Sequence, residues 1–151
     1  MIYLRKANKS DLPLILAWRN NPLIWMGTYT QRSPISWETH EAWWDSRKDH
    51  ISFMAVLLQN DSARDIGVIH ISPLTYWSPE IGIILDVAEW SKGYGTEVFR
   101  LGCEWLKSKG YKWTSTTVLD TNTPMIRVLE KLGFEEFSDA RKGELWYRRE
   151  L

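Results

Sequence analysis

The segment Glu80–Gly95, EIGIILDVAEWSKGYG, constrains the fold of this chain most, because three kinds of local structure follow one another within it. Its first six residues form a short apolar run typical of a buried strand. Gly93 and Gly95 then stand in a turn, after which the periodicity becomes helical. The first N–H groups of a helix have no partner within it and lie at the positive end of its dipole. Glycines there allow close approach to the backbone, so the segment predicts a site for a pyrophosphate.

The spacing of these glycines excludes two common phosphate-binding loops. A nucleoside triphosphate P-loop requires Lys and then Ser or Thr after its last glycine, whereas Gly95 is followed by Thr96 and Glu97. A dinucleotide-binding turn requires a third glycine at position 98, which is Val98. The alternative that remains is a pair of glycines in an ordinary turn.

The rest of the chain alternates between strand and helix patterns. The sequence predicts strands over 2–6, 51–58, 67–71, 80–85, 113–119, 134–137 and 144–149. Helices are predicted to begin near Pro13, Ser36, Gly93 and Thr123, each with a capping residue or proline in its first turn. This order predicts an α+β (mixed α/β) fold in which helices cover a central sheet, with an antiparallel meander over 51–85. No linker or repeat interrupts residues 1–151, so we expect a single domain.

Charge and cysteine content narrow the classes of partner. Lys plus Arg and Asp plus Glu both count 19, so no broad attraction to nucleic acid or to a membrane surface is expected. The single cysteine, Cys103, excludes an internal disulfide and a cysteine-rich zinc site, and no metal is expected. No apolar run is long enough to span a bilayer, and the first residues lack a signal-like stretch. These features predict a cytoplasmic protein.

Two motifs resemble those of the GNAT superfamily of N-acetyltransferases. Trp90–Gly95, WSKGYG, resembles its acetyl-CoA motif [Q/R]-x-x-G-x-[G/A]. The tryptophan in first place is associated with the branch that acetylates ribosomal protein N-termini and with its small-molecule relatives. Asn122–Phe134, NTPMIRVLEKLGF, resembles the family segment N-x-x-[AS]-I-R-[LV]-[YL]-E-K-[LM]-G-F. The resemblance implies a twisted, mostly antiparallel sheet, splayed at an acetyl-CoA cleft near Leu85.

The resemblance also assigns a cofactor site. Acetyl-CoA is the expected acetyl donor, with its pantetheine arm against the backbone of Leu85 and Val87. Asn122 is expected to contact the cofactor, although a polar residue before a helix has a structural explanation as well. The pyrophosphate is expected on the backbone amides of six consecutive residues: Ser91, Lys92, Gly93, Tyr94, Gly95 and Thr96.

Acetyl transfer needs a neutral amine, and a free alkylamine has a pKa near about 10. A group that removes its proton is therefore expected, and the resemblance points to Glu80 on the strand before the glycine turn. His70 is the second catalytic candidate, because imidazole titrates near neutrality, and His40 is a further competitor. Many relatives carry a tyrosine at the position of Leu129 to protonate the leaving thiolate. This chain lacks that acid, and two tyrosines stay unassigned as substitutes: Tyr29 and Tyr76.

The acceptor amine is expected near an aromatic part of the chain. The segment Trp25–Gln31 and the helix after Ser36 resemble acetyltransferases that modify nucleotide-linked amino sugars in pseudaminic-type acid synthesis. Trp25, Trp37 and His40 are therefore predicted to contact the acceptor, the alternative being that they only close the core. The sequence leaves three functions open: acetyl transfer to a sugar amine or other small amine, acetyl transfer to a protein N-terminus, and acyl-CoA binding without catalysis. A homodimer is an assembly that the sequence leaves open.

Overall fold

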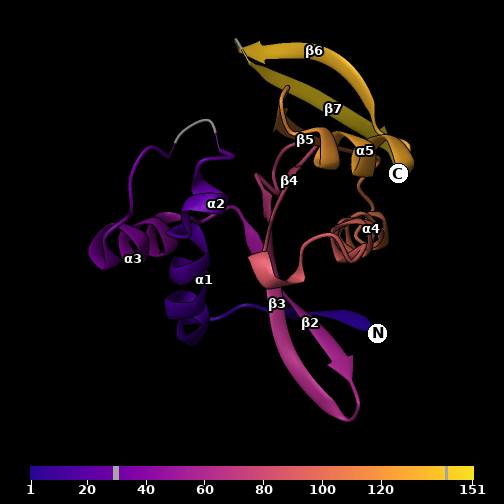
Figure 1. Ribbon diagram of the computed structural model, residues 1–151. Coiled ribbons are helices and arrows are strands. Elements are labelled where there is room, and N and C mark those ends of the chain that lie inside the picture. Colours follow the sequence, from indigo (N-terminus) through magenta and orange to yellow (C-terminus); the bar gives the residue numbers. More distant parts are fainter. Residues whose placement is uncertain (29–30, 142) are drawn as a thin grey trace.

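The computed structural model describes residues 1–28, 31–141 and 143–151, except for the side chains of 138–141. Within these residues, strands β1 to β7 form one twisted sheet in the order β1-β2-β3-β4-β5-β7-β6 (Figure 1). Neighbouring strands are antiparallel except for β4 and β5, which are parallel. The strands are β1 (Ile2–Lys6), β2 (Ile51–Gln59), β3 (Ser62–Ser72), β4 (Glu80–Leu85), β5 (Trp113–Leu119), β6 (Glu135–Arg141) and β7 (Glu144–Glu150).

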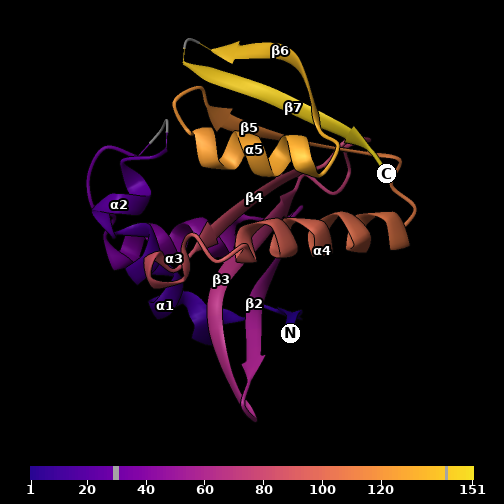
Figure 2. The same cartoon turned by 45° about the vertical axis from the view of Figure 1, so that its right-hand side comes forward.

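Helices cover both faces of this sheet (Figures 1 and 2). On one face lie α1 (Leu12–Arg19), α2 (Pro22–Trp25) and α3 (Trp37–Ser46), and on the other lie α4 (Tyr94–Ser108) and α5 (Thr123–Lys131). Short 3₁₀ turns, η1 (Lys9–Asp11) and η2 (Val87–Glu89), precede α1 and α4.

Each face has its own hydrophobic core because neighbouring strand residues point to opposite sides. Phe53 and Ile69 pack in the core that contains α4 and α5, whereas Met54 and Val68 pack against Ile15 of α1. Among the described residues, no helix is both long and apolar enough to cross a membrane.

The mixed α/β fold and the antiparallel meander β2-β3-β4 were both predicted and are confirmed. Strand β6 runs over Glu135–Arg141 rather than over 134–137, and two further differences concern the end of α1 and the start of β3. The sequence predicts that the first helix ends at Asn20-Asn21-Pro22, and α1 does end there, but Asn21 then caps a new short helix, α2, by accepting from Leu23 N–H. Strand β3 begins at Ser62 rather than Gly67, because its first residues are polar and exposed and so hide the strand pattern.

The sheet opens between β4 and β5, as predicted. Only one pair of residues, Glu80 and Ser115, is in register between these two strands. Near it, hydroxyl groups of β5 donate to carbonyl oxygens just before and within the start of β4: Thr114 Oγ1 to Pro79 O (2.9 Å) and Thr116 Oγ1 to Ile81 O (2.7 Å). Beyond this junction the two strands no longer pair, so their C-terminal halves leave a cleft.

Candidate active site

A cavity of about 320 Å³ occupies the opening between β4 and β5. Its walls come from β4 (Gly82 and Ile83), from β5 (Thr116 to Leu119) and from the loop after α2. Phe99 of α4, Asn122 and Met125 at the start of α5, and Glu144 of β7 complete the lining. Elements from both halves of the sheet therefore meet in one cleft.

The N-terminus of α4 follows directly on the loop that leaves β4. Gly93 is its N-cap with a φ of 82°, and no side chain caps the first amides of this helix. A left-handed φ of this kind favours glycine. Ser91 also has a positive φ, 62°. The residues predicted to hold pyrophosphate, Ser91–Thr96, thus form a sharp turn and the first helical residues, whose amides are free of side-chain caps and suit an anion.

Buried Glu89 anchors this loop. Its carboxylate accepts from Arg64 (2.8 Å) and from Lys92 (3.2 Å), and these bonds hold the pKa of Glu89 below its ordinary value. Lys92, a predicted pyrophosphate residue, therefore has its ammonium group on a carboxylate of the loop. The backbone of Lys92 remains part of the turn.

Trp90 stands where the family motif has Gln or Arg, and its indole Nε1 donates to the carbonyl of Leu85 (3.1 Å). This bond ties the glycine turn back to the end of β4. The backbone of β3 passes close to this end of β4. A Cβ on Gly67 would lie 2.5 Å from the carbonyl oxygen of Ile84, the residue before Leu85. Leu85 and Val87, predicted to meet pantetheine, lie at the end of β4 and in η2, and neither lines the cavity between β4 and β5.

Gly95 lies where α4 packs on β4. A Cβ at this position would lie 3.4 Å from Cδ1 of Leu85 and 3.9 Å from Cδ1 of Ile83. Both are ordinary van der Waals separations, so this packing by itself does not require a glycine. The space around Gly93, by contrast, is open.

Asn122 lines the cleft and caps α5, because its Oδ1 accepts from the N–H of Met125 (3.3 Å). The structural explanation for this asparagine therefore holds. Its position in the cleft wall is also where the predicted contact with the cofactor would be made.

Glu80 begins β4, and Thr117 Oγ1 donates to its carboxylate (3.0 Å). Burial raises the pKa of Glu80, the hydrogen bond from Thr117 lowers it, and the carboxylate of Glu144 raises it. Burial is the largest of these effects, so the pKa lies above its ordinary value. Thr117 and Glu144 both line the cleft, and together they place a carboxyl group of raised basicity at its edge.

His70 lies on β3, and its Nδ1 is 2.6 Å from the hydroxyl of Ser52. Burial, together with Arg47 and Arg19, lowers the pKa of His70 to about 3. The imidazole is therefore neutral at physiological pH and a weak base. His70 is paired in register with Gly82 of β4, which lines the cleft.

The three residues predicted to meet the acceptor differ in accessibility. Trp37, at the start of α3, is 38% exposed. Trp25 is partly buried, and its indole Nε1 has no hydrogen-bond partner among the described residues. His40 is fully buried, with Nε2 on the carbonyl of Leu12 and Nδ1 on Arg19, so direct contact with an acceptor would require it to leave this position.

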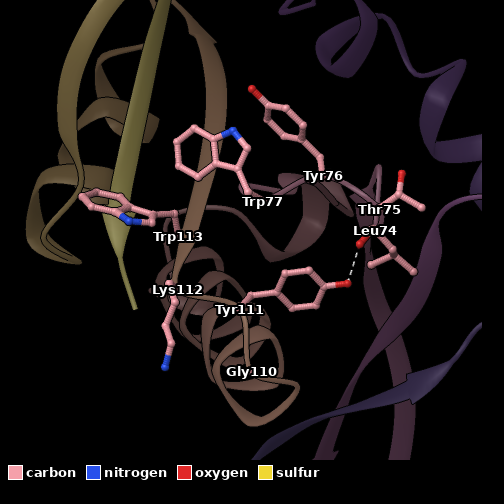
Figure 3. Close-up of a pocket in the computed structure, with 8 residues that line it drawn as sticks. All are labelled: Leu74, Thr75, Tyr76, Trp77, Gly110, Tyr111, Lys112 and Trp113. Atoms are coloured by element: carbon pink, nitrogen blue, oxygen red, sulfur yellow. Dashed lines mark hydrogen bonds between the residues drawn. The ribbon is translucent and has the colours of Figure 1, made fainter.

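Leu129 is fully buried in the core, so the position where relatives carry a tyrosine holds only an apolar contact. Tyr29 lies outside the described residues. Tyr76 lines a different hollow of about 390 Å³, between the loop before β4 and the segment after α4 (Figure 3). There Trp77 and Trp113 lie edge to face, and Tyr111 donates to the carbonyl of Leu74 (2.6 Å). This hollow shares no lining residue with the cleft.

Several residues of the site escape sequence reasoning. Thr117 and Glu144 come from separate strands and meet Glu80 only in the folded sheet. Trp43 and Arg47 of the α3 region likewise reach His70 from a distant segment. Among the described residues, no group of three or more His, Cys, Asp and Glu side chains is arranged to hold a metal ion.

The opened sheet beside an uncapped helix N-terminus agrees with the resemblance to GNAT acetyltransferases seen in the sequence. A model of the acetyltransferase (GNAT) domain matches residues 2–135. Because this match covers most of the chain, the protein belongs to the GNAT acetyltransferase family.

Known relatives support this assignment. An uncharacterized protein of Methanocaldococcus jannaschii is 36% identical over 99% of this chain, but the chain spans only 31% of that protein's length. The crystal structure of a domain from the same organism superposes with a TM-score of 0.96 at 36% identity, covering 100% of this chain and 99% of that one. A spermidine N-acetyltransferase from Vibrio cholerae, solved with CoA and spermine, has a TM-score of 0.83 at 16% identity, covering 99% of this chain and 94% of that one. The latter likeness is one of fold.

Proposed function

We propose that this chain is an acetyl-CoA-dependent N-acetyltransferase that acts on a primary amine by direct attack. The observation that carries the proposal is the cleft between β4 and β5, which lies beside the uncapped N-terminus of α4. Acetyl-CoA joins a pyrophosphate to a long pantetheine arm and a thioester. A helix N-terminus suits the pyrophosphate, and a cleft between unpaired strands offers backbone groups to the arm.

In the proposed reaction the amine nitrogen attacks the thioester carbonyl carbon. The new C–N bond forms and the C–S bond breaks, so CoA leaves as a thiolate. Glu80 accepts the proton that the ammonium form loses before attack, either directly or through water, and its raised pKa brings it closer to that of the amine. The nitrogen loses its second proton to water as the tetrahedral intermediate collapses to the amide. This carboxyl group is therefore the better base of the two candidates, since the pKa of His70 lies at about 3.

Release of CoA requires no acid from the protein. The side chain at position 129 is a buried leucine, so the thiolate takes its proton from solvent. A thiol has an unperturbed pKa near about 8.5, which makes its conjugate base a fair leaving group at neutral pH.

For the acceptor we propose a small amine, with an amino-sugar nucleotide as the leading candidate. Gly27 and Thr28, which belong to the segment that resembles sugar-amine acetyltransferases, line the cleft. Trp37, exposed at the start of α3, could supply packing area for the apolar face of a sugar ring. Transfer to a protein N-terminus is the competing function.

A screen of acceptor amines with thiol release as the readout tests the proposal. A UDP-linked 4-amino sugar is expected to be turned over with a higher kcat/KM than short peptides with free N-termini. Turnover of peptides alone would overturn the proposed acceptor. Acetyl-CoA binding without thiol release for any amine would instead identify an acyl-CoA-binding module.

A further inference from the structure

Two arginines converge on one indole ring beside the cleft. The guanidinium carbon of Arg19, at the end of α1, lies 4.8 Å from the ring centroid of Trp43. That of Arg47, directly after α3, lies 4.4 Å from the same centroid. Both arginines are partly buried. Segments 28 residues apart thus bring two positive charges to one place.

Neither guanidinium group forms an ion pair within the described part of the chain. Among the described residues, no carboxylate oxygen lies within 4.0 Å of a guanidinium nitrogen of Arg19 or Arg47, whereas Arg5, Arg64 and Arg100 each pair with at least one carboxylate. Arg19 contacts Nδ1 of His40 (2.9 Å), and Arg47 donates to the hydroxyl of Ser72 (3.3 Å). Each guanidinium has five N–H donors, so most of them are without a partner among the described residues.

No carboxylate of the described residues contributes to the pKa of Arg19 or Arg47, although Asp49 acts on the neighbouring His50 and Glu80 stands opposite Ser72 in the sheet. Burial lowers the pKa of both arginines, and the proximity of Arg19 contributes to lowering that of Arg47 to about 10. The titratable neighbours are histidines: His40 stacks on Trp43, and His50 and His70 lie near the same ring. Like charges held together out of water are unfavourable unless an anion compensates them.

The strand register places this cluster next to the cleft. Ser72, which accepts from Arg47, pairs with Glu80, and His70 pairs with Gly82. Residues directly opposite in antiparallel strands point to the same face, with Cα atoms about 4.5–5.5 Å apart. Gly82 itself lines the cleft, and no atom lies within 4 Å of where a Cβ on it would stand, so the strand residue opposite His70 leaves open space on this face.

Stacking on Trp43 explains only part of this arrangement. A cation over an aromatic face is attracted to the ring, which explains why each guanidinium group lies over Trp43. It does not account for their unused N–H edges, nor for two cations on one ring. Planar N–H edges are suited to bind phosphate and carboxylate oxygens.

We propose that Arg19 and Arg47, held against Trp43, form a subsite for an oxyanion, a phosphate or carboxylate group carried by the acceptor amine. The role of this subsite in acceptor binding rests on the proposed acetyltransferase function. The binding of an anion there does not depend on that function. A polycation such as spermine is repelled by this cluster, so the subsite selects against polyamines.

Binding of inorganic phosphate to the protein tests the subsite without any turnover. The titration is made by calorimetry at saturating CoA, so that the CoA pyrophosphate already fills the N-terminus of α4. Arg19→Gln and Arg47→Gln are each expected to weaken phosphate binding at least tenfold. Lys48→Gln, which removes an exposed positive charge from the adjacent residue, is the matched control and is expected to leave the affinity unchanged. No measurable phosphate binding by the wild type, or equal affinity in all variants, would overturn the subsite.

Acceptor kinetics then separate the two kinds of anion. Ethanolamine, phosphoethanolamine and β-alanine share an amine on a two-carbon chain and end in a hydroxyl, a phosphate and a carboxylate, and glucosamine with glucosamine 6-phosphate forms a second matched set. In the wild type at least one anionic member is expected to have a KM at least tenfold below its neutral counterpart, and Arg47→Gln is expected to abolish this difference. Anionic members that are no better than neutral ones would contradict the assignment to the acceptor. Phosphate binding with no turnover of any amine would refute the proposed function and leave the subsite standing.

Melting curves show whether each variant is folded. If Arg47→Gln does not fold, Arg47→Lys replaces it, because lysine keeps the charge but lacks the planar fork. This variant is expected to bind phosphate several-fold more weakly, and unchanged binding would count against the proposal.

Discussion

At the scale of single residues, the pKa of the Glu80 carboxyl group determines how the proposed reaction depends on pH. Its pKa is raised mainly by burial, so its ionised fraction, and with it turnover, should rise with pH through a value above the ordinary 4.5. Glu80→Gln is expected to lower kcat about 10²-fold to 10⁴-fold, the usual contribution of a general base, with little change in the affinity for acetyl-CoA. The loss should shrink at high pH as free amine accumulates. Steady-state rates between pH 6 and 10 measure both effects.

A variant of Thr117 separates this role from a structural one. The hydrogen bond from Thr117 lowers the pKa of Glu80, so Thr117→Val should shift the rising limb of the pH profile to higher pH. Glu104→Gln, which alters an exposed carboxylate on α4, is the control and should leave the profile in place. Wild-type turnover by Glu80→Gln at every pH would reassign the base to His70, His40 or water.

At the scale of elements, the start of α4 depends on the left-handed backbone of Gly93. Gly93→Ala places a Cβ in open space but forces a φ of 82° on an L residue, at a cost of roughly 1–2 kcal/mol. We expect a similar loss of stability from Gly110→Ala, where φ is 91° and the space is also open, at the other end of the same helix. Only Gly93→Ala should weaken the binding of acetyl-CoA, because only that turn presents the amides of Ser91–Thr96. Chemical denaturation and calorimetric titration of both variants test this, and equal acetyl-CoA affinity in the two would show that the turn is merely structural.

At the scale of the whole molecule, the sequence predicted features that neighbouring residues determine. It did not predict contacts between segments that are distant in the chain. The bounds of β4 and β5 and the capped starts of α3 and α5 follow from periodicity and capping within a few residues, and all were predicted. The pairing of Glu80 with Thr117 joins different strands, and no periodicity reports it. The burial of His40 was equally hidden, since a helix face shows which residues lie together but not which of them the sheet covers.

The two halves of the sheet explain why acetyl-CoA should stabilise the whole protein. Between β4 and β5 the sheet has one register pair, Glu80–Ser115, with a few hydrogen bonds beside it, and although the core under α4 and α5 spans both halves, the cleft is lined from both as well. A ligand that binds only the native state adds about 2.7 kcal/mol at a concentration of 100 Kd. For a domain of this size each kcal/mol raises Tm by roughly 2–4 °C, so saturating acetyl-CoA should raise it by about 5–10 °C. Pantetheine, which lacks the pyrophosphate, should give a much smaller shift at the same concentration. Thermal melts with both ligands measure this, and an unchanged Tm with acetyl-CoA, in protein shown to carry none from purification, would count against the cofactor site as a whole.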